Sequence, residues 1–329
     1  MKQPVSSRIL SKSKSYQSPR SRRLEYVYQN NQQKLTQYHQ ASRPDNQIDA
    51  RLLNSGLYIV STPIGNLEDI TLRALDVLER ADSIICEDTR ITRRLLTPFA
   101  INTPLVSYHD HNASKLRPQI LKRIREGEVL ALVSDAGTPA ISDPGYKLVR
   151  DCIKAELLVT VIPGATASIS GLVLSGMPTD RFLFQGFLPV KPKQRQKTLG
   201  ELSGITVSLV FYESPGRLVR SLKDMLDVLG NRPAAVLREL TKLHEEVCRG
   251  TLKELAEHYG ENKRPKGELM VVVGPMQKKP FTDDSELRSV LIEKLNNLSV
   301  RDAVAEVALV TNQPRQKIYE IAIGLKDKS

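Results

Sequence analysis

The chain has 329 residues, of which 40% are hydrophobic and 26% charged, and its 48 Lys and Arg against 37 Asp and Glu give a formal charge of +11. This composition excludes a disordered or fibrous protein and indicates a globular one that can hold two domains. Its apolar runs, such as Ile205–Tyr212 and Leu269–Val273, have the length of strands and fall short of the about 18 residues that a membrane helix needs. Three widely spaced cysteines, Cys86, Cys152 and Cys248, favour neither a disulfide framework nor a zinc ribbon and suit a reducing cytosol.

The beginning of the chain differs from the rest in composition. Residues 1–50 contain nine Lys and Arg against three Asp and Glu, a net charge of +6, and are rich in Ser and Gln without a helical or strand period. Such a segment buries too little apolar surface to offset its ordering entropy, so residues 1–54 are predicted to be a disordered basic tail. Three interpretations stay open: a dispensable extension, an arm that adds salt-dependent affinity for RNA, and a transit peptide.

From Gly56 onward, short β-branched runs alternate with helical patterns. The segment Ile70–Arg80, for example, carries its apolar residues on one helical face. The alternation predicts an N-terminal α/β domain over residues 55–177, with a parallel sheet and helices on its faces. The strands expected in it are Leu57–Ser61, Ser83–Cys86, Leu105–His109, Val129–Ser134 and Leu157–Ile162. The turn-forming residues Gly176–Asp180 mark the end of this domain.

A second α/β domain is predicted over residues 178–276. Its expected strands are Phe182–Phe187, Thr206–Tyr212, Ala234–Glu239, Glu245–Cys248 and Leu269–Val273. The fourth of these strands is expected to pair antiparallel with the third, which makes this sheet mixed. A helix is expected over residues 215–229, with Ser214 as its cap, Pro215 in its first position and Gly230 at its end.

The last part of the chain, residues 281–329, has a helical pattern. Two apolar stripes, one over residues 300–308 and one over residues 318–325, are separated by the turn Thr311–Pro314. This pattern predicts a small helical hairpin that resembles a helix-turn-helix. A nucleic-acid-binding role and simple packing on the body of the protein are both open, because such hairpins serve both purposes.

Four strands are followed by loops that are rich in Gly, Pro and small residues. These loops are Ser61–Leu67, Ser134–Gly145, Pro163–Ala167 and Gly186–Pro189. Loops at the carboxyl ends of parallel strands form the ligand crevice of such sheets, and Gly lets the backbone approach a ligand closely. The pattern predicts a cleft lined mostly by backbone, with ordinary turn chemistry as the alternative for any single loop. The sequence lacks GxGxxG, GxxxxGK[ST], HExxH and GxSxG motifs and any Cys/His cluster, so no nicotinamide, P-loop or metal site is expected.

Titratable residues gather at the ends of three strands. Glu87–Arg90, Tyr108–Asn112 and Tyr212–Arg217 each follow or end a predicted strand. A carboxylate or His at the carboxyl end of a strand is placed to accept a proton from a substrate hydroxyl. The structural alternatives are a helix cap at Asp88 and a surface ion pair within Glu87–Arg90.

Taken in order, these segments resemble those of the small-subunit (16S) ribosomal RNA cytidine 2′-O-methyltransferases, within the tetrapyrrole methylase superfamily. The matching blocks are Pro63–Asp69, Glu87–Arg90, Ser107–Asn112, Ser134–Gly145, Pro163–Ala167 and Gly186–Pro189. The resemblance covers about residues 55–325, and its PIGNLxD and SDAGTPxISDPG blocks are long and specific. The C-terminal helical segment also matches a module that this family often carries.

The resemblance implies two α/β domains with S-adenosylmethionine bound in the cleft between them, a homodimer and a cytoplasmic location. Carried over by position, the residues expected to contact the cofactor are Pro63, Gly65, Asn66, Leu67, Asp135, Ala136, Gly137, Thr138, Ile141, Thr166, Ala167 and Leu188. The sequence departs from the family at Gly216, where a His usually follows the Tyr-Glu-x-Pro block, and at Ala113, where Glu is common. The first departure weakens any proton-transfer role for a His of that loop.

The resemblance also implies a reaction, the in-line transfer of a methyl group to the 2′-hydroxyl of a cytidine in 16S ribosomal RNA or in the small ribosomal subunit. Holding the reacting atoms in line supplies a large part of such catalysis. Asp88, His109 and Glu213 are the candidate proton acceptors, and Arg90 and Arg217 are the candidates for positioning RNA phosphates. Two alternatives are a methyltransferase that acts on carbon atoms of a tetrapyrrole (uroporphyrinogen or precorrin) ring and a non-catalytic RNA-binding assembly factor.

Overall fold

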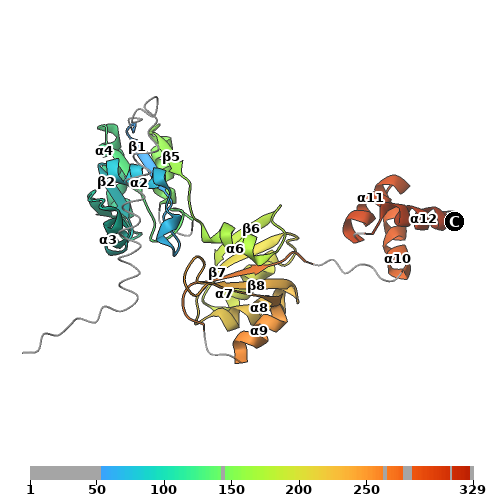
Figure 1. Cartoon of the computed structure of the whole chain (residues 1–329). Helices are drawn as coiled ribbons and strands as arrows, with labels where there is room; N and C mark the ends of the chain where they lie inside the picture. The colour runs from blue at the N-terminus through green and yellow to red at the C-terminus, as the bar shows by residue number, and fades with distance from the viewer. Residues whose placement is uncertain (1–52, 142–144, 262–264, 277–283, 312, 327–329) are drawn as a thin grey trace, which may run out of the picture. The chain divides into compact units, whose positions relative to one another are not determined.

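The computed structural model describes residues 53–141, 145–261, 265–276, 284–311 and 313–326. The predicted disordered tail lies outside the described residues, except for its last two. The described chain forms two compact units, which divide between Thr166 and Ala167 (Figure 1). Within the described ranges, every helix is too short or too polar to cross a lipid bilayer.

Unit 1 is built on a five-stranded sheet in which all strands run parallel, as the sequence predicts. Its strands are β1 (Gly56–Val60), β2 (Ser83–Cys86), β3 (Leu105–Ser107), β4 (Val129–Leu132) and β5 (Val159–Ile162). They lie in the order β3-β2-β4-β1-β5. β3 and β4 end two residues earlier than predicted, because the chain leaves the sheet there and enters the loops.

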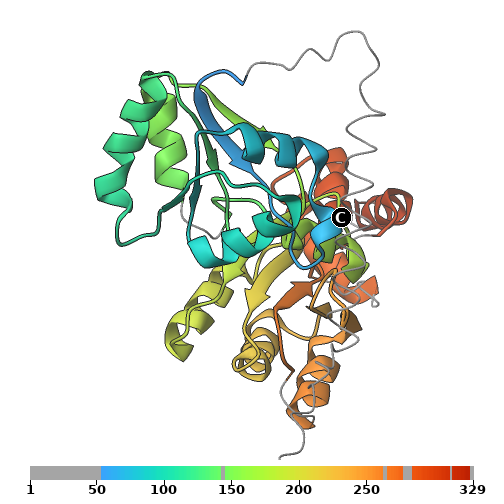
Figure 2. The same cartoon turned by 60° about the vertical axis from the view of Figure 1, so that its left-hand side comes forward.

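Helices cover both faces of this sheet. The helical elements are η1 (Leu67–Asp69), α2 (Leu72–Arg80), α3 (Thr89–Leu96), η2 (Thr97–Phe99), α4 (Ala113–Arg125) and α5 (Tyr146–Lys154). One hydrophobic core joins α2 and α3 to the sheet, and a second core joins α4 and α5 to it. Figure 2 shows α4 and α5, in green, on the side of the sheet away from α2. The helix predicted from Ile70 begins at Leu72, because the Thr71 hydroxyl accepts a hydrogen bond from the Ala74 amide and caps it.

Unit 2 contains the predicted mixed sheet. Its strands are β6 (Phe182–Phe187), β7 (Ser208–Glu213), β8 (Pro233–Arg238), β9 (Glu246–Thr251) and β10 (Leu269–Val273), in the order β6-β7-β10-β8-β9. β6 and β7 are parallel, and the other neighbouring pairs are antiparallel. The predicted antiparallel pairing of β8 with β9 is therefore confirmed.

The helices of unit 2 again lie on both faces of the sheet. α6 (Ala167–Ser175) contacts β7, β8, β9 and β10, whereas α7 (Pro192–Leu202), α8 (Leu218–Leu229) and α9 (Leu252–Glu261) share a core on the other face (Figure 1). Because α6 packs on this sheet, the compact units divide earlier in the chain than the boundary after residue 177 that the sequence predicts.

Helix α8 shows a second difference from the sequence prediction. It begins at Leu218, not at Pro215, because the Ser214 carbonyl accepts hydrogen bonds from the amides of Arg217 and Leu218 and holds a turn in front of the helix. The predicted cap role of Ser214 is therefore wrong. The predicted end of the helix at Gly230 is confirmed, with a φ of 78° at that glycine.

In the described residues 284–311 and 313–326, the C-terminal module has three helices, not the two of the predicted hairpin. They are α10 (Asp284–Leu295), α11 (Val300–Thr311) and α12 (Arg315–Lys326). The predicted stripes on α11 and α12 form a common core with Leu287 and Leu291 of α10. A two-helix hairpin buries little apolar surface, and the third helix closes the core.

Gly56 tests how tightly the sheet of unit 1 is packed, and Gly200 in α7 of unit 2 serves as the control. A Cβ on Gly56 would lie 2.8 Å from the carbonyl oxygen of Leu158, beside which β1 pairs with β5, whereas a Cβ on Gly200 in α7 would meet no atom within 4 Å. We expect Gly56→Ala to lower the free energy of unfolding by about 1–3 kcal/mol. The control Gly200→Ala should raise it by up to about 1 kcal/mol, because Ala favours helix. Urea unfolding of both variants measures this, and equal effects would contradict the packing.

Candidate functional site

The carboxyl ends of the five parallel strands place five loops along one edge of unit 1. Because the strand order is β3-β2-β4-β1-β5, the loop that follows β4 lies between those that follow β2 and β1. The loop that follows β5 adjoins that of β1 on its other side. This edge brings together most of the residues that the sequence singles out.

The loops after β1 and β4 are joined by backbone hydrogen bonds. The Thr62 amide donates to the Gly137 carbonyl at 2.9 Å, and the Gly137 amide donates back to the Thr62 carbonyl at 3.1 Å. The Thr62 and Ser134 hydroxyls add hydrogen bonds to the carbonyls of Ser134 and Gly137, respectively. Gly137 has a φ of 83°, and a Cβ on it would lie 3.3 Å from the side chain of Ile64. Only glycine suits this position without strain.

The loop after β5 joins the same assembly. The hydroxyls of Ser61 and Thr138 lie 3.0 Å apart, and the Thr138 hydroxyl donates to the Ala165 carbonyl at 3.4 Å. A Cβ on Gly164 would lie 2.9 Å from the Cβ of Ser61. The three loops, residues 61–67, 134–141 and 163–166, therefore form one surface, which we call the loop platform. Gly65, Ala136 and Gly164 are exposed on it and offer backbone groups to a ligand.

Acidic groups border the loop platform at the ends of β2 and β4. The Asp88 amide donates to the Asp135 carboxylate at 3.3 Å. Burial and the neighbouring Asp88 charge raise the pKa of Asp135. Burial, followed by the charges of Asp135 and Asp110, also raises the pKa of Glu87. Glu87 and Asp135 thus lie in surroundings that favour the protonated form of a carboxyl group. The sequence pattern does not indicate this shift.

Asp88 itself has the geometry of a helix cap. Its carboxylate accepts from the Arg90 amide at 2.8 Å and pairs with the Arg90 guanidinium at 2.7 Å. These hydrogen bonds from Arg90 lower the pKa of Asp88 to about 2. A carboxylate this acidic is a weak proton acceptor at neutral pH. The geometry therefore favours a helix-cap role for Asp88. It also pairs the Arg90 guanidinium with Asp88, although most of the Arg90 side chain is exposed.

His109 lies in the turn between β3 and α4. Its amide donates to the side-chain oxygen of Asn112 at 2.9 Å, and the Asn112 side-chain nitrogen lies 3.4 Å from His109 Nε2. The other ring nitrogen, Nδ1, is buried and has no hydrogen-bond partner among the described residues. Of the two ring nitrogens of His109, Nε2 thus lies beside a polar side chain and Nδ1 does not.

Unit 2 carries a separate cluster at the end of β7. Glu213 is 3% exposed, and its carboxylate accepts from the Ser214 amide at 2.7 Å and from the Ser221 hydroxyl. Arg217 Nε lies 3.2 Å from the same carboxylate, and Arg217 also donates to the Leu188 carbonyl at 2.5 Å. Arg217 thus contacts two other predicted residues, Glu213 and Leu188.

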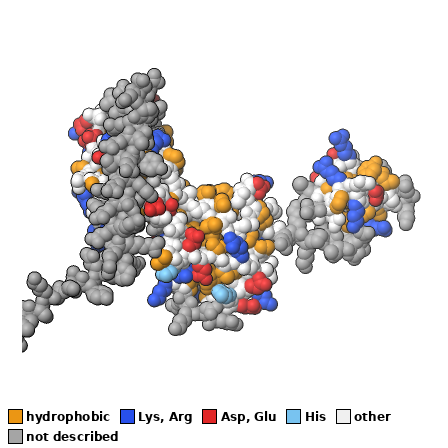
Figure 3. All heavy atoms as spheres, viewed as in Figure 1, with side chains coloured by type: hydrophobic (Ala, Val, Ile, Leu, Met, Phe, Trp, Pro, Cys, Tyr) orange, Lys and Arg blue, Asp and Glu red, His pale blue; other side chains and the backbone are white. Residues whose placement is uncertain are grey.

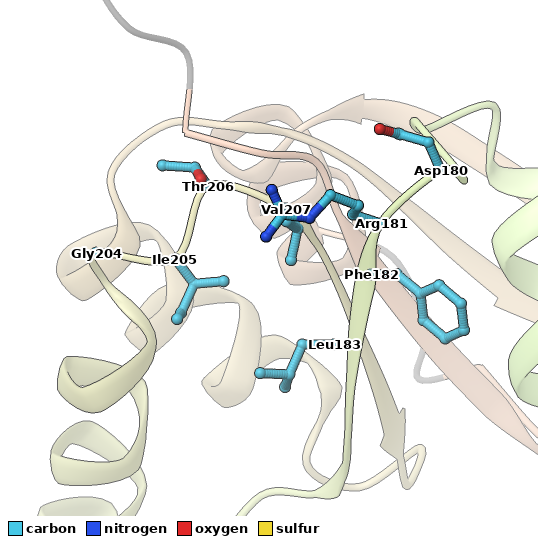
Figure 4. Close-up of a pocket in the computed structure, with 8 residues that line it drawn as sticks. All are labelled: Asp180, Arg181, Phe182, Leu183, Gly204, Ile205, Thr206 and Val207. Atoms are coloured by element: carbon cyan, nitrogen blue, oxygen red, sulfur yellow. The ribbon is translucent and has the colours of Figure 1, made fainter. Parts of the chain in front are cut away.

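A shallow hollow of about 600 Å³ lies at the opposite, amino-terminal ends of β6 and β7. It is lined by Asp180–Leu183 and Gly204–Val207, and Figure 4 shows Phe182 directed away from the other apolar side chains. None of the predicted functional residues lines it. Among the described residues, no group of three or more His, Cys, Asp or Glu is placed to hold a metal ion.

Comparison with known proteins assigns the fold and the site to a family. The model of the tetrapyrrole (corrin/porphyrin) methylases matches residues 56–256, and that of the RsmI C-terminal HTH domain matches residues 282–326. The chain belongs to the tetrapyrrole methylase family. This tetrapyrrole methylase is therefore an S-adenosylmethionine-dependent methyltransferase.

The match to two relatives extends over nearly the whole length of each relative. The protein named ribosomal RNA small subunit methyltransferase I of Mesorhizobium japonicum is 45% identical, over 86% of this chain and 96% of the relative. The protein of the same name from Erythrobacter litoralis is 50% identical, over 84% and 98%. A conserved hypothetical protein from Aeropyrum pernix K1 has the same fold, with a TM-score of 0.55 at 17% identity, over 84% of this chain and 98% of that chain.

The predicted cofactor residues of this methylase divide between the two units. Ala167 and Leu188 belong to unit 2, and the side chain of Leu188 is buried in the core formed with α7 and α8. The Asn66 side chain caps η1 by accepting from the Glu68 amide at 3.2 Å. The others lie on or beside the loop platform: Pro63, Gly65, Leu67, Asp135, Ala136, Gly137, Thr138, Ile141 and Thr166.

The Asp88–Arg90 pair predicts a pH dependence for the methylase. Because the folded pKa of Asp88 lies below its ordinary value, the stabilisation by Asp88 is complete above the ordinary value and is lost as pH falls toward 2. The stability difference between the wild type and Asp88→Asn should therefore be largest near neutral pH and shrink below about pH 4. Urea unfolding between pH 7 and pH 2.5 measures it. In Arg90→Gln the pKa of Asp88, followed by NMR, should rise, and an unchanged value would contradict the pairing.

Proposed function

We propose that this chain transfers a methyl group from S-adenosylmethionine to the 2′-hydroxyl of a cytidine in 16S ribosomal RNA. The observation that carries the proposal is the 43–50% identity to proteins named ribosomal RNA small subunit methyltransferase I, extending over 96% and 98% of two of them. The HTH-domain match at residues 282–326 supports an RNA substrate. The reaction replaces the ribose O–H bond by an O–CH₃ bond and releases S-adenosylhomocysteine and a proton.

The loop platform fits the cofactor. Gly137 and Gly164 let its loops pack closely, because a Cβ on either would press on Ile64 or Ser61, and the exposed residues Gly65, Ala136 and Gly164 leave the backbone open to a nucleoside. We assign Gly65, Ala136, Gly137 and Thr138 to the cofactor, with Asp135 as the carboxylate at its edge. The bound cofactor supplies a methyl group that its sulfonium already activates, so the protein has to orient it and exclude water.

A proton must leave the 2′-hydroxyl. Of the three candidate acceptors, Asp88 is paired with Arg90, and Glu213 is buried among its own donors. We therefore assign the role of proton acceptor to His109, which follows β3 at the same carboxyl edge of the sheet as the loops of the platform. General bases contribute about 10²–10⁴-fold, which sets the loss expected in His109→Ala.

The basic segment at residues 1–50 suits a polyanionic partner. On the face seen in Figure 3, basic and acidic side chains of unit 2 are intermixed, so no single basic field covers it. Residues 1–50 carry a net charge of +6. We propose that this segment and the C-terminal module bind the ribosomal RNA of the small subunit. We also propose that the enzyme works in the cytoplasm and that it acts as a homodimer.

The basic segment predicts salt-dependent binding. Removing residues 1–50 should weaken binding to ribosomal RNA and make log K fall less steeply with log salt, by about 0.7–0.9 for each phosphate contact that is lost. Filter binding at several salt concentrations measures the slope. A slope that stays the same would assign RNA binding to the rest of the chain.

The loop platform predicts a specific loss of activity. Gly137→Ala should reduce methyl transfer from labelled S-adenosylmethionine to 16S ribosomal RNA by about 10²-fold, because a small displacement of the platform misplaces the reacting atoms. Gly127→Ala is the matched control, since that glycine also has a positive φ, of 105°, but would meet no atom within 4 Å and precedes β4. The label should enter one ribose. Label entering uroporphyrinogen and no RNA would replace the proposed function with tetrapyrrole methylation, and no cofactor binding would favour a non-catalytic assembly factor.

A further inference from the structure

The loop after β6 is held by more than its own backbone. β6 has an irregular register between Phe184 and Gly186, where Gly186 has a φ of 71°, and its pairing with β7 resumes at Gly186 and ends at Phe187. The three residues Leu188–Val190 then lead into α7. The side chain of Leu188 is buried, whereas Phe187 and Val190 are 55% and 72% exposed.

The carbonyl groups of this loop accept hydrogen bonds from two arginines. Arg217, in front of α8, donates to the Leu188 carbonyl at 2.5 Å. Arg195, in the first turns of α7, donates to the carbonyls of Val190 at 3.0 Å and Pro189 at 3.4 Å. Three successive carbonyls of the loop therefore face guanidinium groups.

Each of the two arginines is paired with a carboxylate on unit 2. Arg195 is 4% exposed, and its Nε donates to Asp224 of α8 at 2.6 Å. Arg217 lies beside the buried carboxylate of Glu213. Glu213 is itself held by the Ser214 amide and by the Ser221 hydroxyl of α8. Both pairs thus connect the loop to α8.

We propose that Arg217 and Arg195 are positioning residues that hold the Leu188–Val190 loop in the conformation required for cofactor binding. This inference rests on the proposed function and on the contact between Leu188 and S-adenosylmethionine that the family resemblance implies. The Arg195 guanidinium hydrogen-bonds both a carboxylate and two loop carbonyls, whereas Arg217 hydrogen-bonds the Leu188 carbonyl and is attracted to the Glu213 carboxylate as an ion pair. A planar guanidinium held in this way fixes the direction of its hydrogen bonds, and a loop that is ordered in advance loses less entropy when a ligand binds. The role differs from the phosphate contact that the sequence predicts for Arg217, because its donors face the protein.

Calorimetric titration of S-adenosylmethionine tests this role. Arg217→Lys and Arg195→Lys keep the charge but cannot make the divided contact, so each should raise the Kd for the cofactor by about tenfold. The double variant should raise it by less than the product of the single effects, because both residues act on one loop. Arg220→Lys is the control, since its guanidinium is on the exposed side of α8 and donates only to Gly216, at 3.5 Å. It should leave the Kd unchanged.

Binding to ribosomal RNA separates this role from its rivals. The Kd for RNA and its salt dependence should stay as in the wild type in both lysine variants. A weaker RNA complex with normal cofactor affinity would restore the phosphate role of Arg217 and overturn the proposal. Normal affinity for both ligands together with a lower melting temperature would reduce the two pairs to structural contacts, and so would also overturn it.

Hydrogen exchange in the ligand-free protein covers two remaining cases. The amides of Phe187, Leu188, Val190 and Lys191 should exchange faster in the lysine variants, and those of the buried strand β10 should not. This result supports the positioning even if the wild type binds no S-adenosylmethionine, which would refute only the proposed function. If Arg217→Lys fails to fold, Ser221→Ala removes one donor to Glu213 and should give the same pattern at a smaller size. Unchanged amide exchange rates in the loop would contradict the inference.

Discussion

The two backbone hydrogen bonds between Thr62 and Gly137 are the constraint on which the candidate site depends. They join the loops that leave β1 and β4, and they require a residue with positive φ and no side chain at position 137. With these loops joined, Thr138 comes within reach of Ser61 and of the loop after β5. A surface made of backbone results, and its shape depends little on side-chain rotamers.

The two units order their loops by different means. In unit 1 the loops after β1, β4 and β5 bond to one another through amides, carbonyls and hydroxyls, which carry no net charge. In unit 2 the loop after β6 is bonded to arginines that are paired with carboxylates. Buried ion pairs contribute little net stability, since desolvation opposes the attraction, but they direct their hydrogen bonds. In this protein the two ion pairs fix the direction in which the arginines donate to the loop carbonyls.

The candidate acids and bases show how partners decide a role. Asp88 and Glu213 both follow the pattern of a carboxylate at the end of a strand. In the fold, Asp88 caps α3 and pairs with Arg90, while Glu213 is enclosed by Ser214, Arg217 and Ser221. The sequence offers the cap and the ion pair of Asp88 as alternatives to a catalytic role. It does not show the environment of Glu213, because the partners Arg217 and Ser221 lie before and within a helix that begins later than its pattern indicates. His109 differs from both carboxylates in that its buried Nδ1 has no hydrogen-bond partner among the described residues.

The sequence by itself determined the alternation of strands and helices, the parallel and mixed sheets, the Gly- and Pro-rich loops and the family, because these depend on local periodicity and on long specific blocks. It did not determine where α8 begins, that α6 packs on the second sheet, or that the C-terminal module has three helices. Those features follow from competing hydrogen bonds and from the apolar surface that neighbouring elements leave open. The tertiary structure also decided that Arg217 meets Leu188 and Glu213, since a contact across 29 residues depends on how β6, β7 and α8 pack together.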